Sequence, residues 1–475
     1  MPEPKKPLSL PLLTAVVVGS MLASGMFTLP ASFANATGPL GLLIAWSIAA
    51  VGMLALALVF QHLAQRRPDL NAGVFAYAKA GFGPYPGFLS ALGYWAGICL
   101  LNVTYFVLVK ATLGGIVPGF GDGNTVQAVA VSSVLLWGVH AVILRGVKEA
   151  AMINAVVTMA KVIPIMLAVI ILALGFQRQV FVGNFWGGGL YHWVDIPAQV
   201  RGAMLITVYA FIGIEGASVF SRYAKRRKDV GLATLLGLAG VASLFFLVTL
   251  LSYGVMLRPD LAALRQPSLA GVLEAVVGRW GAWLVGLGIV VSVTGAFLAR
   301  SLLAAEVLWS AARADTMPAC FARESPRRVP AAALWLSSAS VQGFLILTLF
   351  AEEAYTVAFK LTSAMLLVPY LLVAGFALKL AWQGGGGGET AAARRRELVQ
   401  AAVATVFAAF LIWAAGLNYL LGAALIYAAG TVLFVVARRE QRRPPFAKHE
   451  AALFGVLLML AAAAVYALST GVIGL

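Results

Sequence analysis

Long apolar stretches alternate with short polar ones along almost the whole chain. Each apolar stretch is close to the roughly 20 residues that a helix needs to cross the hydrocarbon core of a bilayer. Backbone N–H and C=O groups cannot stay unpaired in lipid, so such stretches must be helical. The pattern predicts an all-α integral membrane protein of about thirteen spans. The predicted spans are residues 10–36, 39–64, 85–117, 125–144, 150–176, 199–222, 230–257, 279–311, 331–351, 355–381, 398–416, 418–437 and 452–473.

The composition agrees with a chain whose main solvent is the bilayer. Of its 475 residues, 61% are hydrophobic and only 11% are charged, whereas a soluble domain is about one quarter charged. The first apolar stretch is long and is followed by many more, so we expect it to be retained as a span rather than removed as a signal peptide.

The net charge of +16 does not indicate nucleic acid, because the cations follow the predicted topology. With a cytoplasmic N-terminus, almost all Lys and Arg outside the spans fall on the inner side, as the positive-inside rule requires. The odd span count then places the C-terminus outside. We therefore expect a multi-pass protein of the cell inner membrane. The few cations on the outer side are Arg178, Arg201, Arg258, Arg265 and Arg279.

Three regions divide the chain. Residues 1–381 form the predicted transport core of ten helices. Residues 382–397 contain five consecutive glycines and then three arginines, which predicts a cytoplasmic linker. Residues 398–475 supply accessory helices 11–13. The short amphipathic stretch 70–83 predicts a re-entrant or interfacial helix.

Two spans carry small residues at their centres, and these residues weaken the helix there. Span 1 contains Gly19–Phe27 and span 6 contains Phe211–Gly216. Gly disfavours a helix by about 1 kcal/mol relative to Ala, and unwound backbone in a membrane must face a cavity or a ligand. Freed N–H groups bind a carboxylate and freed C=O groups bind an ammonium, the two ends of an α-amino acid. Close helix packing through small residues is the alternative.

Three ionisable residues lie deep in predicted spans, where such groups are costly and usually functional. Glu215 is predicted to be a proton-sensitive or gating residue, or else a structural contact. Lys161 is predicted to replace or couple a cation, or to form a structural ion pair. Arg300 either pairs with Glu215 or meets an anionic group of the substrate.

No motif indicates an enzyme, a cofactor or a metal. The four His residues are scattered without ligand spacing, and the two Cys residues suggest neither a disulfide framework nor a cluster. The P-loop, the dinucleotide fingerprint and the HExxH motif are absent from the sequence. ATP-driven transport is therefore not expected.

Several segments together resemble the basic amino acid/polyamine antiporters of the amino acid–polyamine–organocation superfamily, most of all the arginine:ornithine antiporter type. The resemblance covers at least residues 10–381 and implies two inverted five-helix repeats with helices 1 and 6 broken at their centres. It also suggests a dimer, although no interface can be read from the sequence. The segments are GSMLASGMFTLP, AGVFAYAKAGFG, GYWAGICLLNVTYFVL, RGVKEAAMIN, YAFIGIEGAS, LLAAE with DTMP, and LLVPYLL.

The resemblance implies a role for individual positions. Ser24 and Gly25 match positions that hold the substrate carboxylate. Carbonyls that face the α-ammonium are matched by those of Met21, Tyr209 and Ile212. Positions that line the side-chain pocket are matched by Tyr94, Gly97, Ile98, Asn102 and Thr362. The family's proton-sensing gate residue is matched by Glu215, and the lysine that stands in for sodium by Lys161.

The sequence departs from the family pattern at helix 8. Arg300 falls where the family has a tryptophan that stacks on a guanidinium. A second cation there repels a cationic side chain unless Glu215 neutralises it. Two milder changes are Ala23 in place of a glycine and Tyr209 in place of a tryptophan.

We expect an alternating-access exchanger of amino acids, with basic amino acids as substrates. The alternative is a proton-coupled permease for neutral or acidic amino acids, with Arg300 reshaping the side-chain pocket. Amino acid substrates and membrane lipid are the expected partners.

Replacing Arg300 by Ala should change which amino acid side chain is accepted, because it removes a buried cation from the predicted pocket. The measurement is competition by unlabelled arginine, ornithine, lysine, glutamate and alanine for labelled uptake. An unchanged order of preference would contradict a role for Arg300 in recognition.

Overall fold

The computed structural model confirms an all-α architecture, since the regular elements in the described residues are helices. The described residues are 9–22, 24–67, 69–70, 73–115, 118–121, 123–145, 163–187, 195–214, 227–327, 329–350, 353–384 and 391–470.

Ten helices in this part of the chain are long and apolar enough to cross a membrane. They correspond to ten of the thirteen predicted spans. They are α3 (Pro39–Arg66), α5 (Pro84–Gly114), α6 (Val126–Arg145), α11 (Arg227–Ser252), α14 (Arg279–Arg313), α15 (Ala331–Leu347) with η5 (Thr348–Phe350), α16 (Ala354–Gln383), α17 (Ala391–Ala415), α18 (Leu417–Glu440) and α19 (Lys448–Ser469).

The other three predicted spans are interrupted or only partly described. Span 1 consists of two helices, α1 (Leu10–Met21) and α2 (Gly25–Ala36). Span 5 is described from Ile163, where a helix to Leu174 is followed after a 95° bend by α8 (Arg178–Asn184). Span 6 begins with α9 (Ile196–Ala210).

The chain divides into two compact units. Unit 1 comprises residues 1–57, 104–132 and 148–299, and unit 2 comprises residues 58–103, 133–147 and 300–475.

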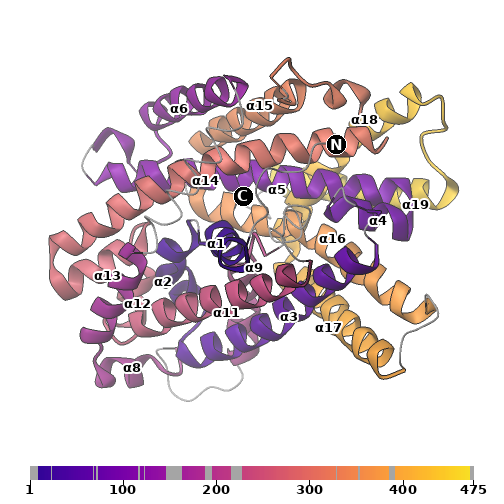
Figure 1. Cartoon of the computed structure of the whole chain (residues 1–475). Coiled ribbons are helices and arrows are strands. Elements are labelled where there is room, and N and C mark those ends of the chain that lie inside the picture. Colours follow the sequence, from indigo (N-terminus) through magenta and orange to yellow (C-terminus); the bar gives the residue numbers. More distant parts are fainter. Residues whose placement is uncertain are drawn as a thin grey trace. The chain divides into compact units, whose positions relative to one another are not determined.

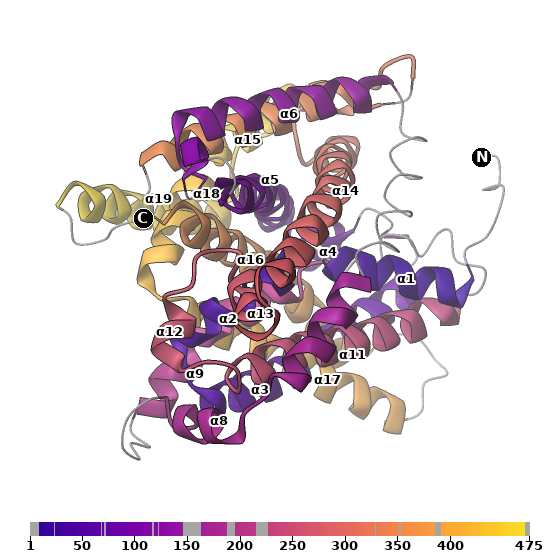
Figure 2. The same cartoon turned by 90° about the vertical axis from the view of Figure 1, so that its left-hand side faces the viewer.

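In unit 1, α1 lies along α11, while α2 packs against α9, α11, α12 (Arg258–Ala262) and α13 (Ser268–Val277) (Figure 2). An added Cβ at Gly237 of α11 would lie 2.6 Å from the Val17 side chain of α1, so glycine permits the close approach. Aromatic rings fill the core beside these helices. They are Phe33, Trp46, Phe211 and Phe245, with ring centroids 5.3–6.3 Å apart.

In unit 2, α16 packs against α4 (Val74–Phe82), α17 and α18, and α18 packs against α19 (Figure 1). The nine-residue α4 lies in the stretch predicted to form a re-entrant or interfacial helix and is too short to span. Tyr77 of α4 stacks on Phe376 of α16, and the Lys379 ammonium donates to the Gly81 carbonyl over 2.7 Å. These contacts hold α4 on the end of α16.

Residues Glu450 and Tyr85 join the start of α19 to the start of α5. The Glu450 carboxylate is 2% exposed and accepts the backbone N–H groups of Tyr85 and Ala447, each over 2.9 Å. First-turn amides have no partner within their own helix, and a carboxylate is favoured at the positive end of a helix dipole. One carboxylate therefore caps two helices.

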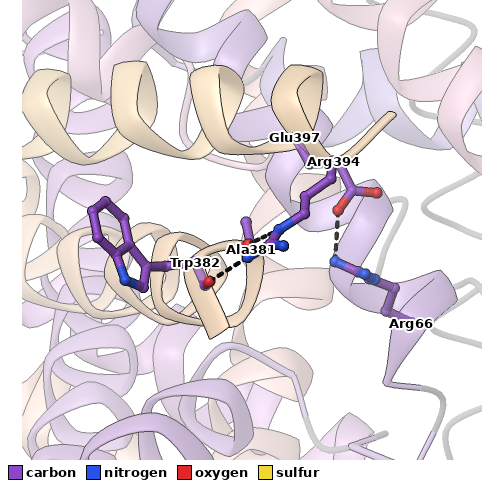
Figure 3. A network of polar contacts seen from close by, with 5 residues as sticks. All are labelled: Arg66, Ala381, Trp382, Arg394 and Glu397. Carbon is purple, nitrogen blue, oxygen red and sulfur yellow. Dashed lines mark hydrogen bonds and ion pairs between the residues drawn. The ribbon is translucent and has the colours of Figure 1, made fainter. Parts of the chain in front are cut away.

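The connection from α16 to α17 is closed by charged side chains (Figure 3). The Arg394 guanidinium donates to the carbonyls of Ala381 and Trp382 at the end of α16, over 3.2 and 2.6 Å. Arg66 of α3 pairs with Glu397 of α17 at 2.6 Å. Because α17 begins at Ala391, the last part of the stretch predicted as a linker is helical.

Replacing Gly93 by Ala should destabilise unit 2. An added Cβ would collide with the Tyr427 hydroxyl and lie 2.8 Å from the Met365 carbonyl oxygen. Overpacking of this kind lowers the free energy of unfolding by about 1–3 kcal/mol, which thermal unfolding in detergent would detect. The matched control is Gly343→Ala in α15, where no described atom lies within 4 Å and Ala should be neutral or stabilising. Equal midpoints for the two variants would contradict the packing.

Candidate functional site

The break between α1 and α2 is confirmed at residues 22–24, of which Leu22 and Ser24 are described. The helix α1 ends at Met21, and the Leu22 N–H still reaches the Val18 carbonyl over 2.8 Å. Helix α2 restarts at Gly25 with no side chain capping its first amides. The carboxyl end of α1 and the amino end of α2 therefore meet in the middle of one predicted span.

The start of the second predicted break is also confirmed. Helix α9 ends at Ala210, and residues 211–214 form turns. Gly213 has φ of 110°, a conformation that other residues rarely adopt. The Tyr209 carbonyl, predicted to face an ammonium, accepts the Ile212 N–H over 3.2 Å.

One hydrogen bond brings the two breaks together within unit 1. The Ser24 Oγ and Tyr209 Oη atoms lie 2.6 Å apart, and the two residues are 0% and 4% exposed. A Cβ at Gly25 would lie 3.5 Å from the Tyr209 ring, so this ring lies over the start of α2.

The electrostatics of these helix ends suit a zwitterion. The amino end of α2 carries partial positive charge, while the carboxyl ends of α1 and α9 carry partial negative charge. An α-carboxylate is favoured at the amino end of α2, and an α-ammonium at the carboxyl ends of α1 and α9.

Sequence reasoning missed a residue that braces α2. The Ser268 hydroxyl of α13 accepts the Ala31 N–H and donates to the Thr28 carbonyl, each over 3.1 Å. Pro30 lies between these two residues of α2 and lacks an N–H. Ser268 therefore steadies the helix at its proline. Because Ser268 lies far away in the sequence, no local pattern pointed to it.

A second missed group caps the other end of α2. The Arg258 Nε donates to the Ala34 carbonyl over 2.8 Å, its Nη1 donates to the Gly187 carbonyl, and its backbone N–H donates to Asn184 Oδ1 over 2.7 Å. The Tyr253 hydroxyl donates to the Thr37 carbonyl over 2.5 Å. From the sequence, Arg258 indicated only the orientation of the chain in the membrane.

The predicted side-chain pocket residues lie in unit 2, separate from the group just described. Four of these residues lie on neighbouring turns of α5: Tyr94, Gly97, Ile98 and Asn102. The side chains of Tyr94, Ile98 and Asn102 are buried. A Cβ at Gly97 would lie 3.2 Å from the Leu366 side chain, so α5 and α16 pack closely here. One turn from Leu366, Thr362 donates its hydroxyl to its own helix at the Ala358 carbonyl, over 2.7 Å.

Asn102 and Arg300 are both buried in unit 2. Asn102 is 1% exposed and its Nδ2 lies 3.5 Å from the Ser301 Oγ, at the limit of a hydrogen bond. Its Oδ1 has no hydrogen-bond partner among the described residues. Arg300 is 6% exposed, so this cation faces the interior of unit 2. A buried acceptor without a donor suits a ligand N–H.

Two predicted residues, Glu215 and Lys161, lie outside the described residues. The predicted pairing of Arg300 with Glu215 therefore remains a prediction. Among the residues that are described, no group of three or more His, Cys, Asp or Glu side chains could hold a metal ion.

Comparison with known proteins agrees with a transport role. A profile of the amino acid permease family matches residues 8–437. The chain is 46% identical over 475 residues to the arginine/ornithine antiporter of Pseudomonas aeruginosa, covering 99% of this chain and 98% of that protein. It is 39% identical to a putative arginine/ornithine antiporter of Escherichia coli K12, covering 98% of this chain and 99% of that protein. It is 38% identical to the L-lysine transport protein of Corynebacterium glutamicum, covering 98% and 94%.

These matches run through both units and all the predicted site residues. A transporter of amino acids, and not an enzyme, agrees with the many apolar helices and with the family match. The chain therefore belongs to the amino acid permease family.

Proposed function

We propose that this protein exchanges basic amino acids across the membrane by alternating access, with arginine and ornithine as the substrate pair. The names of its relatives support this choice, since two are called arginine/ornithine antiporters and a third a lysine transport protein. The observation that carries the proposal is the Ser24–Tyr209 hydrogen bond, which joins two broken helices whose ends are complementary to an α-amino acid.

Unit 1 supplies the groups for the main-chain end of the substrate. The substrate carboxylate binds at Ser24 and Gly25, where the first amides of α2 have no side-chain cap. The α-ammonium binds at the carbonyls of Met21, Tyr209 and Ile212, at the ends of α1 and α9. Every amino acid carries both groups, so this part of the site does not select among side chains.

The proposed selection of the side chain rests on the positions that the family resemblance assigns to the side-chain pocket. The substrate side chain is proposed to lie among apolar and hydroxyl groups, those of Tyr94, Gly97, Ile98 and Thr362. The Asn102 Oδ1 accepts an N–H from the substrate side chain. Arg300 is the specificity residue that distinguishes this chain from the pattern of its family.

Two further residues complete the transport cycle. Lys161 takes the place of a coupling cation, so no sodium is needed. Glu215 gates the site and responds to protons. With no other ion gradient involved, exchange of one cationic amino acid for another is close to electroneutral.

The proposed setting is the cell inner membrane with the N-terminus in the cytoplasm, supported by the excess of cations in alternate loops. Helices 1–10 form two inverted five-helix repeats within residues 1–381, and residues 398–475 are accessory. The protein needs no cofactor and functions in contact with lipid as a homodimer.

Exchange should be seen in liposomes that contain the purified protein and are preloaded with unlabelled amino acid. Labelled arginine should enter vesicles loaded with arginine or ornithine, because each inward step requires an outward one. Vesicles loaded with alanine or glutamate, and empty vesicles, are the controls. Uptake of acidic or neutral amino acids into empty vesicles under a proton gradient would contradict exchange and favour a proton-coupled permease.

Replacing Ser24 by Ala should raise the KM for every accepted amino acid by a similar factor. The hydroxyl contacts the common main-chain end, and a hydrogen bond to a charged group contributes about 1.5–3 kcal/mol, so KM should rise roughly tenfold or more. Ser32→Ala is the matched control, because the Ser32 hydroxyl bonds only the Thr28 carbonyl of its own helix. A change in preference among substrates, without a general rise in KM, would place Ser24 at the side chain instead.

A further inference from the structure

Residues 438–448 connect the ends of α18 and α19 and carry an unusual density of positive charge. Four arginines occupy six consecutive positions, from Arg438 to Arg443, and Lys448 follows at the start of α19. We call residues 438–448 the arginine loop. Its single carboxylate is Glu440.

The arginine loop is folded on a rigid base. Phe446 inserts among the rings of Tyr85, Phe434 and Phe454, with centroids 5.0–5.6 Å away. The Ala447 N–H is held by the buried Glu450. The apolar side of the loop is therefore fixed to the core of unit 2, which leaves its polar side outward.

The loop's own carboxylate is already used. Glu440 Oε2 accepts the backbone N–H of Ala319 over 2.7 Å, and the neighbouring Gln441 side chain donates to the Asp315 carbonyl over 3.0 Å. Both bonds tie the loop to the segment that follows α14. Glu440 is therefore occupied by a backbone amide, and it forms no ion pair with an arginine of the loop in the described structure.

Of the cations in the arginine loop, Arg438 is held by contacts within the loop and the other four are exposed. Arg438 donates to the Pro444 carbonyl over 3.1 Å and lies 5.8 Å from the centre of the Phe434 ring. Arg439, Arg442, Arg443 and Lys448 are exposed. No carboxylate in the described part of the chain pairs with these four.

Two arginines of the loop contribute to the lowered pKa of a neighbouring lysine, Lys79. Burial lowers the pKa of Lys79 below its usual range, Asp315 raises it, and Arg443 and Arg438 lower it further. Lys79 also donates to the Ala314 carbonyl and, over 3.2 Å, to the Thr316 hydroxyl. Two arginines of the loop are therefore near Lys79, although burial is the main reason for its lowered pKa.

We propose that the arginine loop binds the phosphate headgroup of an anionic phospholipid at the membrane surface where α18 and α19 enter the bilayer. The loop directly joins two spanning helices, so its exposed guanidinium groups lie within reach of lipid headgroups. Arginine is suited to phosphate because its planar fork makes two parallel hydrogen bonds. The preformed aromatic base means that little chain entropy is lost on binding.

The test uses the full chain purified in a neutral detergent. Phosphatidylglycerol or phosphatidylcholine is added, and bound lipid is counted by native mass spectrometry alongside the thermal midpoint. Phosphatidylglycerol should bind more tightly and should raise the midpoint, and added salt should weaken it. Equal retention of the two lipids would overturn the proposal.

The Arg442→Gln/Arg443→Gln variant should lose about thirtyfold in affinity for phosphatidylglycerol, at about 1 kcal/mol for each cation near the surface. Arg395→Gln/Arg396→Gln removes the same charge from exposed positions at the start of α17 and should change affinity much less. Equal losses in the two variants would mean that net charge, rather than this loop, attracts the lipid.

Two further arms distinguish lipid binding from binding of free phosphate and from a loss of stability. Inorganic phosphate should not displace phosphatidylglycerol at matched concentration, and displacement would overturn the lipid as the occupant.

If the double variant unfolds at a lower temperature than the unaltered protein in phosphatidylcholine, the Lys448→Gln variant is tested in its place. Its affinity for phosphatidylglycerol should fall about fivefold. An unchanged affinity in that variant would count against the loop. Binding is measured without transport, so the outcome does not depend on which amino acids are exchanged.

Discussion

The constraint on which this structure depends is that backbone polar groups in hydrocarbon must find partners inside the protein. Ten helices in the described residues are long and apolar enough to cross a membrane with their backbone groups bonded within the helix. Helices α1 and α2 are not, because the chain stops being helical between Met21 and Gly25. Backbone groups at such an interruption need partners other than their own helix, and a ligand or a cavity can supply them.

An interrupted helix also has to be held in place from outside. In unit 1 this is done by polar side chains. Tyr209 bonds the Ser24 side chain just before α2, Ser268 bonds the backbone of α2 around Pro30, and Arg258 bonds a carbonyl in its last turn. Each of these partners belongs to a different helix. The start of α2 and the end of α9 are thus joined by a hydrogen bond within one packed unit.

In unit 2, the main feature is the close packing of long helices. Glycines bring α5 against its neighbours, as at Gly93 and Gly97, while Glu450 caps α5 and α19 together. The polar groups that remain are of two kinds. Asn102 is buried with an open acceptor, whereas the arginine loop is exposed with its charge uncompensated. The first suits a small molecule in the membrane interior, and the second suits an anionic surface.

The sequence alone determined the class of the protein, most of its spans, the break in span 1 and the start of the break in span 6, because hydropathy and glycine content act locally along the chain. It also singled out Arg300 as a cation at a depth where cations are rare, and this residue is buried. Only the tertiary structure decided which polar groups meet. Ser24 and Tyr209 are 185 residues apart, and Ser268 and Arg258 looked like ordinary loop residues. Such contacts depend on how helices pack, and a pattern read along one helix carries no information about the side chains that its neighbours bring to it.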